Sequence, residues 1–143
     1  MVEGDFLGQP AALREAKREW VENGTKGDQD MIHTTVRMVI PPQKRAEALQ
    51  ILNVITERTR VQPGCLSCRL YHDEQVEAVF MVEEVWNSQE DLDRHLRSDN
   101  YRNMLFVTEM AVEPPEIRFR TVTDLAGLEI IEKARGCMRD EGR

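Results

Sequence analysis

Apolar and polar residues follow two periodicities between residues 31 and 60. Residues 31–40 are rich in β-branched side chains and end at Pro41-Pro42, which is typical of a strand followed by the opening of a helix. From residue 43 to about residue 61, apolar or small side chains recur at steps of three and four, and charged residues fill the other side. The recurring positions are Ala48, Leu52, Ile55 and Thr59. The pattern predicts an amphipathic helix.

Two further strands are predicted after the helix stop Gln62-Pro63-Gly64. Residues 65–72 form the first, and residues 73–75 make a turn. Residues 78–86 form the second, and its first five residues are apolar on both sides. Such a strand is expected to be buried on both faces.

The last part of the pattern predicts two short helices and a fourth strand. Ser88 and Asp91 have the spacing of a helix cap, and Leu92, His95 and Leu96 share the inner side of the helix that follows. Residues 98–100 interrupt it. A second helix is expected to place three side chains on one side: Tyr101, Met104 and Leu105. Residues 116–122 alternate as a strand.

The predicted order is β-α-β-β-α-β, an α+β ferredoxin-like arrangement. Both helical layers then cover one face of a four-stranded sheet, and the other face is bare. We expect that bare face to present apolar side chains: Leu66, Leu70, Val79, Met81 and Val85. An apolar patch of this size normally marks an interface, so we expect a homodimer formed through the sheets.

Shorter helical patterns flank the domain. We divide the chain into an N-terminal helical or partly disordered extension, residues 1–30, the ferredoxin-like domain, residues 31–122, and a C-terminal helix and tail, residues 123–143. The N-terminal pattern uses Ala12, Leu13, Ala16 and Trp20, and the C-terminal pattern uses Leu125, Leu128, Ile131 and Ala134. We expect both helices to pack on the dimer or to extend its interface, because free helices of this length are marginal.

The composition argues against nucleic-acid-binding, membrane-spanning and secreted proteins. The net charge is −7, with 26 Asp and Glu against 19 Lys and Arg, which argues against a nucleic-acid partner. No apolar run approaches the roughly 20 residues of a membrane span, and residues 1–10 lack the basic start of a secretory signal. Three cysteines form no disulfide framework, so we expect a cytoplasmic protein.

Four residues are candidates for chemistry: His95, Trp86, Tyr101 and Glu84. An inner-face imidazole can move protons, although a buried histidine bonded to the backbone is the simpler interpretation. An aromatic ring at a strand end can stack on a planar substrate or simply pack. Tyr101 can close the same pocket or be a core residue. Glu84 shares strand parity with Trp86 and faces the helices, whereas Glu83 faces the dimer side, where Arg side chains can pair with it.

The motif Cys65-Leu66-Ser67-Cys68 is formally a C-x-x-C, but it begins a strand rather than a helix. Positions i and i+3 of a regular strand point to opposite faces, so the thiols are expected not to pair. No metal site is expected, because a zinc centre needs two more ligands. The thiols are interpreted as small core residues. No flavin, nicotinamide or Walker fingerprint is present either.

Three segments carry a family resemblance: QPGCLSCRLY at residues 62–71, EEVW at residues 83–86, and SQEDLDRHLRSDNY at residues 88–101. With the element order, they resemble the antibiotic-biosynthesis monooxygenase (ABM) family of dimeric α/β-barrel proteins. The resemblance covers residues 31–122. It implies a homodimer whose sheets close a shared barrel, and a pocket between helices and sheet bordered by His95 and Trp86.

The resemblance implies a cofactor-independent monooxygenase that oxidises a small aromatic quinol or phenol with O₂. His95 would handle the proton, Trp86 and Tyr101 would form aromatic walls, and Glu84 would be a polar contact. Haem is not expected, since Val36 stands where the haem-degrading branch has a pocket Asn and Leu105 stands near its axial His. Two alternatives stay open: a non-oxidative, isomerase-like enzyme on a small polar metabolite, and a non-catalytic small-molecule-binding or stress-response dimer.

Overall fold

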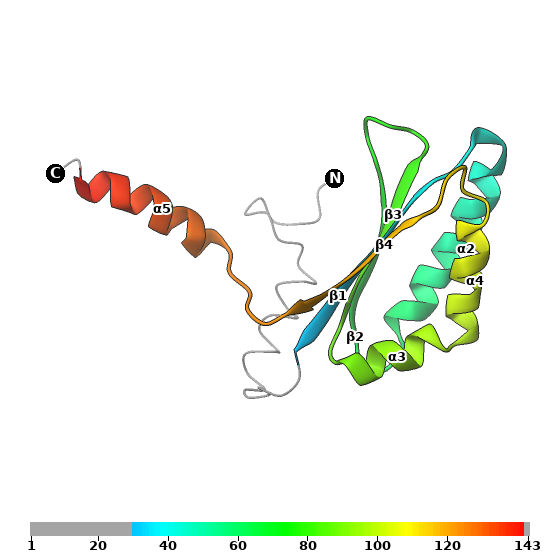
Figure 1. Cartoon of the computed structure of the whole chain (residues 1–143), viewed down its shortest axis with the longest axis horizontal. Coiled ribbons are helices and arrows are strands. Elements are labelled where there is room, and N and C mark those ends of the chain that lie inside the picture. Colours follow the sequence, from blue (N-terminus) through cyan, green and yellow to red (C-terminus); the bar gives the residue numbers. More distant parts are fainter. Residues whose placement is uncertain (1–29, 142–143) are drawn as a thin grey trace. The chain divides into compact units, whose positions relative to one another are not determined.

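The computed structural model describes residues 30–141. A four-stranded sheet in the order β2-β3-β1-β4 has all its neighbouring strands antiparallel, and helices α2, α3 and α4 lie on one side of it (Figure 1). The elements are β1 Met31–Val39, α2 Pro42–Arg60, β2 Cys65–His72, β3 Val79–Trp86, α3 Gln89–Leu96, α4 Asp99–Thr108, β4 Glu116–Val122 and α5 Leu128–Glu141. The predicted ferredoxin-like α+β fold is confirmed.

The helix α2 begins and packs as its sequence predicts. Pro41 is the extended residue before the helix, and Pro42 occupies its first position, where a missing N–H costs nothing. The predicted stripe is buried, with Ala48, Leu52, Ile55 and Thr59 facing the sheet and α4. The main core therefore lies between these helices and the strands β1, β2 and β3.

The strand register divides the sheet into a helix side and an open side. On β3, the side chains of Phe80, Val82, Glu84 and Trp86 are buried toward the helices. Their direct partners on β1 are Met38, Val36, Thr34 and Ile32, which are buried as well. Alternate residues of each strand face the open side. Polar Glu84 is thus placed inside an otherwise apolar row.

The open side differs from the predicted apolar patch. Val79 and Val85 are buried, with 5% and 3% exposed, and Leu70 packs into the helix-side core. Leu70 changes sides because a β-bulge lies between Cys65 and Ser67, so that Leu66 has no direct partner on β3 and the parity of β2 shifts by one. The prediction of a continuous exposed apolar face was wrong for these residues.

Leu105 was also misassigned. The helix α4 begins after Ser98, whose hydroxyl accepts the Tyr101 N–H. The helix buries Asn100, Tyr101, Met104 and Val107, whereas Leu105 is 45% exposed. Successive residues of a helix turn by about 100°, so Asn100, Met104 and Val107 share the inner side and Leu105, the residue after Met104, points outward.

The helix α5 is longer than the pattern indicated. It begins at Leu128, later than the predicted Leu125, and reaches Glu141. It belongs to a unit separate from the sheet domain, which ends at Val122. The predicted N-terminal helix lies outside the described residues. Within residues 30–141, no helix has the length and apolar character to cross a membrane.

Candidate active site

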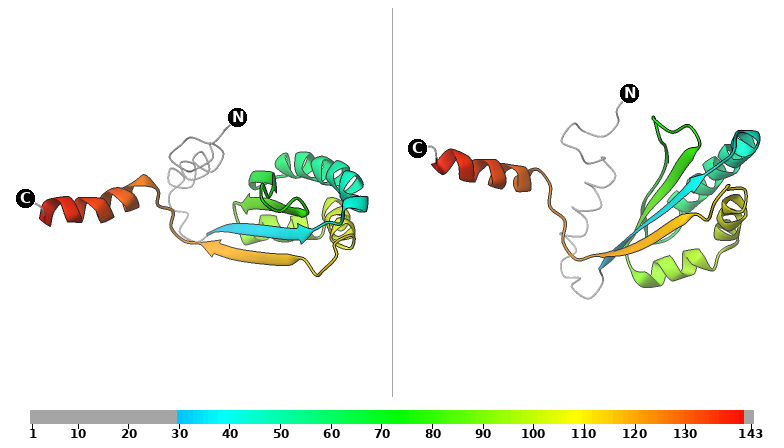
Figure 2. Two further views of the ribbon diagram at one scale, coloured as in Figure 1. Left: turned by 90° about the horizontal axis from the view of Figure 1, so that it is seen from above. Right: turned by 45° about the horizontal axis from the view of Figure 1, so that its top comes forward.

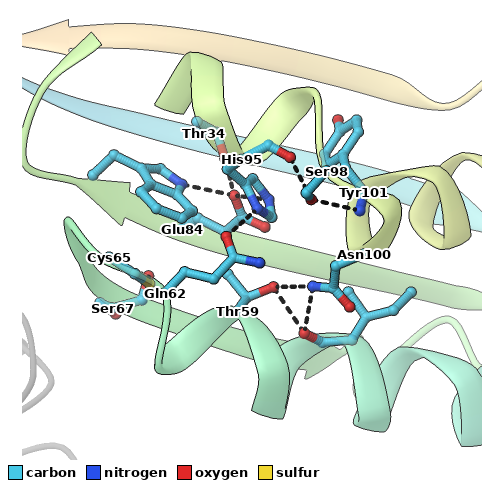
Figure 3. A network of polar contacts seen from close by, with 12 residues as sticks. Thr34, Thr59, Gln62, Cys65, Ser67, Glu84, His95, Ser98, Asn100 and Tyr101 are labelled. Atoms are coloured by element: carbon cyan, nitrogen blue, oxygen red, sulfur yellow. Dashed lines mark hydrogen bonds and ion pairs between the residues drawn. The ribbon is translucent and has the colours of Figure 1, made fainter. Parts of the chain in front are cut away.

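The carboxylate of Glu84 is the centre of a buried polar network on the helix side of the sheet (Figure 3). Its Oε1 accepts a hydrogen bond from the indole N–H of Trp86 at 2.9 Å and from the hydroxyl of Thr34 at 3.4 Å. Thr34 is the direct partner of Glu84 on β1. The other carboxylate oxygen of Glu84, Oε2, is buried without a hydrogen-bond partner among the described residues. A buried carboxylate oxygen left unpaired is costly, and it is free to accept a proton or a ligand.

His95 contacts Glu84 from α3. The helix is fixed at its start by the predicted cap, in which Ser88 Oγ accepts the Asp91 N–H. This places His95 on the inner side, with its side chain fully buried and its Nε2 3.3 Å from Glu84 Oε1. The two atoms lie at ion-pair distance, although their geometry is not that of a hydrogen bond. The structure therefore brings a base and an acid into one buried pair.

Gln62 holds the other ring nitrogen of His95, with Oε1 2.9 Å from Nδ1. If the amide oxygen accepts from Nδ1–H, the Nε2 lone pair faces the Glu84 carboxylate, and a proton between them relieves the repulsion. If the amide is turned, its NH₂ donates to Nδ1 and Nε2 carries the hydrogen toward Glu84. Either orientation allows His95 and Glu84 to hold one proton in common.

Aromatic rings enclose the imidazole on two sides. Trp86 stacks on His95 with ring centroids 4.6 Å apart and planes 28° apart. Tyr101 meets His95 edge to face, at 5.1 Å and 78°. Trp86 is fully buried and Tyr101 is 8% exposed. All four predicted site residues are therefore brought together, and their side chains close the site against solvent.

Burial raises the pKa of Tyr101 to about 12, and the negative charge of Glu84 adds to that shift. The phenol therefore remains protonated over the whole neutral range. Asn100, the residue before it, donates from Nδ2 to the Ile55 carbonyl at 3.2 Å and to Thr59 Oγ1 at 2.9 Å. These bonds join α4 to α2 and fix Tyr101 beside the imidazole.

The two cysteines of the C-x-x-C lie on the same face, contrary to the prediction. The bulge at Leu66 pairs Cys65 with Trp86 and Cys68 with Glu84, so both thiols face the helices beside the site. Burial and the Glu84 charge raise the pKa of Cys65 to about 12, and they shift the pKa of Cys68 upward as well. Their interpretation as core residues agrees with their packing, since Cys68 is buried in the core and Cys65 packs against it.

One apolar strand lies next to the network without a helix covering it. On β4, Ile117 and Phe119 face the helix side but are 38% and 51% exposed. Phe119 is the direct partner of Thr34, the residue that donates to Glu84. Directly paired residues on one face have Cβ atoms about 4.5–5.5 Å apart. An exposed aromatic ring therefore stands one side chain away from the buried Glu84–His95 pair.

No metal-binding cluster is assembled in the described part of the chain. Among residues 30–141, no group of three or more His, Cys, Asp or Glu side chains is placed to hold a metal ion. Val36 is buried and apolar and Leu105 is an exposed aliphatic residue, so neither fits a haem.

Sequence reasoning missed Gln62 and Thr34. Gln62 was interpreted only as part of a helix stop, and Thr34 only as part of a strand. Their roles depend on the strand register and on the turn at Gly64, neither of which is encoded in a local motif.

The fold and the site define a small α+β protein with a buried carboxylate–imidazole pair under aromatic rings. The family model "antibiotic biosynthesis monooxygenase" matches residues 31–105, more than half of the chain. The chain belongs to this family, whose members usually dimerise.

Solved structures share the fold at low identity. A conserved protein of Methanosarcina mazei has a TM-score of 0.62 at 21% identity, covering 67% of this chain and 96% of its own. The protein Rv0793 of Mycobacterium tuberculosis has a TM-score of 0.62 at 24% sequence identity, and the match covers 67% of this chain and 98% of Rv0793. By sequence comparison, the chain is also similar to an uncharacterized protein of Synechocystis sp., with 26% identity over 100 residues that cover 69% of this chain and 68% of the Synechocystis protein. These likenesses support the fold and leave the substrate open.

Proposed function

We propose that this protein is a cofactor-independent monooxygenase that oxidises a small aromatic phenol or quinol with O₂. The observation that carries the proposal is the buried Glu84–His95 pair, with 3.3 Å between Oε1 and Nε2, under the indole of Trp86. A carboxylate and an imidazole at this distance can take up and return a proton. The anion of an electron-rich phenol or quinol can reduce O₂, and a site closed to water protects that anion and the intermediates that follow from side reactions.

The apolar face of β4 is the proposed approach for the substrate. Phe119 and Ile117 are exposed beside Thr34, which donates to the Glu84 carboxylate. A flat ring resting on Phe119 would place its hydroxyl toward Glu84 Oε2, the oxygen without a partner. Because Trp86 and His95 are fully buried, binding requires a local movement that opens the site.

The chemistry balances without a cofactor. The Glu84–His95 pair accepts the phenolic proton, and the phenolate gives one electron to O₂. The resulting radical and superoxide combine at a ring carbon as a peroxide anion, and the Glu84–His95 pair returns the stored proton to give the hydroperoxide. Loss of the ring hydrogen as a proton and of hydroxide then yields the quinone and one water. One oxygen atom of O₂ enters the product and the other leaves as water.

Oxygen uptake with a panel of hydroquinones and phenols, without flavin or metal, tests the proposal. We expect wild-type uptake above buffer. Glu84→Gln and His95→Gln should lower kcat by about 10²–10⁴-fold, the range of a lost general acid or base. Phe119→Ala should mainly raise KM, and Val76→Ala, in the β2–β3 hairpin, serves as the matched control. No wild-type uptake across the panel would contradict the proposal.

A non-catalytic binding dimer is the second candidate, and one observation favours it. The side chains of His95 and Trp86 leave no solvent-exposed surface in the site. In that case ligands would bind without oxygen uptake, and Glu84→Gln would change affinity only. Turnover of a ligand without oxygen uptake would instead indicate an isomerase-like enzyme.

We further propose a homodimer formed through the open side of the sheet, since members of the family usually dimerise. On that side His33 Nε2 lies 2.8 Å from Glu83 Oε2, and the Tyr71 hydroxyl donates to Glu83 Oε1 at 3.2 Å. Glu83 is thus paired within its own chain, and Met81 beside it is half-buried. Light scattering should give twice the chain mass, and Met81→Asp should shift it toward the monomer. A wild-type monomer at micromolar concentration would contradict this.

A further inference from the structure

The helix α5 carries an apolar stripe that nothing in the described chain covers. Ile130 is 59% exposed and Ile131 is 53% exposed, and Ala134 on the same side is exposed as well. Successive residues of a helix turn by about 100°, so these three side chains fall within one narrow arc. An isolated helix of 14 residues is marginal in water, and its stability in proteins comes from packing an apolar side. We therefore expect another apolar segment to pack on this stripe.

The two ends of the chain leave the sheet at neighbouring points. Met31, the first residue of β1, is the direct partner of Val122, the last residue of β4. The strands β1 and β4 lie side by side (Figure 2). Residues 1–30 and 123–143 both lie beyond the family match at residues 31–105. Whatever these two segments do is added to the family domain at a single place.

The N-terminal segment has a pattern that complements α5. Residues 11–21, which lie outside the described residues, carry Ala12, Leu13, Ala16 and Trp20 within a 100° arc of an ideal helix. The segment leads into β1 and α5 follows β4, so an antiparallel pair would bring both connecting segments to the same end of the hairpin. Trp20 precedes Met31 by eleven residues and Ile131 follows Val122 by nine, so similar lengths of chain separate the two side chains from the paired residues.

We propose that residues 11–21 form a helix that packs antiparallel on the Ile130–Ile131–Ala134 stripe of α5 in the same chain. The product is a helical hairpin made of the two segments that precede β1 and follow β4. The occupant is this segment because both partners are tethered to adjacent strands, and tethering by a short linker gives a millimolar effective concentration. The hairpin is independent of the oxygenase activity proposed above.

Trp20 provides the readout, since the chain has only two tryptophans and Trp86 is buried. Subtracting the emission of Trp20→Phe from that of the wild type isolates Trp20. We expect it to be blue-shifted and shielded from acrylamide several-fold relative to a peptide of residues 9–23. Ile130→Gln/Ile131→Gln should shift the emission to the red and remove the shielding. The control is Glu132→Gln/Lys133→Gln, on the opposite side of α5. It also leaves the net charge unchanged, and it should alter neither the emission wavelength of Trp20 nor its shielding from acrylamide.

Three outcomes would overturn the assignment. Trp20 as accessible in the full-length protein as in the peptide would show that the segment does not dock. Equal shielding in both double variants would place it elsewhere. Recovery of shielding when the Ile130→Gln/Ile131→Gln protein is refolded together with Trp20→Phe chains would show that it docks on another chain's α5.

Discussion

The buried carboxylate of Glu84 influences most of the residues in the candidate site. Glu84 is 3% exposed, and its carboxylate contacts Thr34, Trp86 and His95. Its charge adds to burial in raising the pKa values of Tyr101, Cys65 and Cys68. The buried carboxylate therefore favours the protonated forms of the phenol and of the two thiols around it.

The ionisation of Tyr101 tests this electrostatic picture. In Tyr71→Phe, Tyr101 is the only tyrosine left, and phenolate absorbance should appear with a midpoint near pH 12. The unfolded chain ionises near pH 10, so the protein should lose stability as the pH rises above that value. Adding Glu84→Gln should lower the midpoint, because the second cause of the shift is gone. A folded midpoint at the unfolded value would contradict the burial of this ring.

The thiols provide a second test. Since burial and Glu84 raise their pKa values, Cys65 and Cys68 should resist iodoacetamide at about pH 8, where an ordinary thiol with a pKa near 8.5 reacts. Mass mapping of the native protein should show both sites unmodified, and the same protein in urea should be alkylated at both. Equal rates in the two conditions would rule out the packing described here.

The sequence predicted the side of the sheet on which the candidate residues lie, but not their connections. The placement of His95, Trp86 and Glu84 on the helix side follows from helical and strand periodicity, which depends on local spacing alone. Thr34 and Gln62 reach the site only through the register of β1 against β3 and through the end of α2. Periodicity places a side chain on a face, whereas register decides which side chain it meets.

At the scale of elements, irregular backbone positions the site. The strand boundaries at residues 65–72 and 116–122 coincide with the predicted ones, because Pro, Gly and capping residues mark them. No residue type in the sequence marks the bulge at Leu66. Beyond the bulge, the side chains of β2 that face the core are those that an unbroken alternation would place on the open side. The predictions for Leu70 and for the cysteine pair failed at this single irregularity.

Gly64 connects the turn after α2 to the start of α3. Its φ is +86°, and a Cβ there would lie 2.1 Å from Asp91 Cγ. Gly64→Ala should destabilise the protein by at least about 1–2 kcal/mol, the cost of a left-handed conformation with a side chain. Urea denaturation measures it, and Gly64→Ala/Asp91→Ala should not restore the stability, because the Cβ of residue 91 also lies 2.4 Å from the added Cβ. An unchanged midpoint for Gly64→Ala would contradict this account of the turn.

Glu83 on β3 gives the sheet a pH-dependent contact. The hydrogen bond from His33 lowers the pKa of this carboxyl. A carboxyl with a depressed folded-state pKa stabilises the fold above its unfolded pKa, about 4.3, and that stability disappears as the pH falls through the folded value. Glu83→Gln should therefore lower stability at neutral pH and flatten its acid dependence. Glu57→Gln, on the exposed side of α2, is the control and should change neither.

The whole molecule combines a family domain with additions of its own. The ferredoxin-like sheet and its helices carry the Glu84–His95 site, and β4 leaves an apolar face beside it. The segments before Met31 and after Val122 start from paired residues and lie outside the family match. Removing residues 123–143 should leave oxygen uptake unchanged within about twofold, while Trp20 becomes accessible, because the site and the hairpin share no residue. Loss of uptake on truncation would contradict this separation.

Insertion of one oxygen atom without a cofactor is measured with isotopically labelled dioxygen. The purified protein is incubated with labelled O₂ and an oxidisable phenol or quinol, and the product is analysed by mass spectrometry. The account predicts one labelled oxygen atom in the quinone and none in the Glu84→Gln reaction above background. Product without labelled oxygen, or equal labelling by wild type and Glu84→Gln, would contradict it.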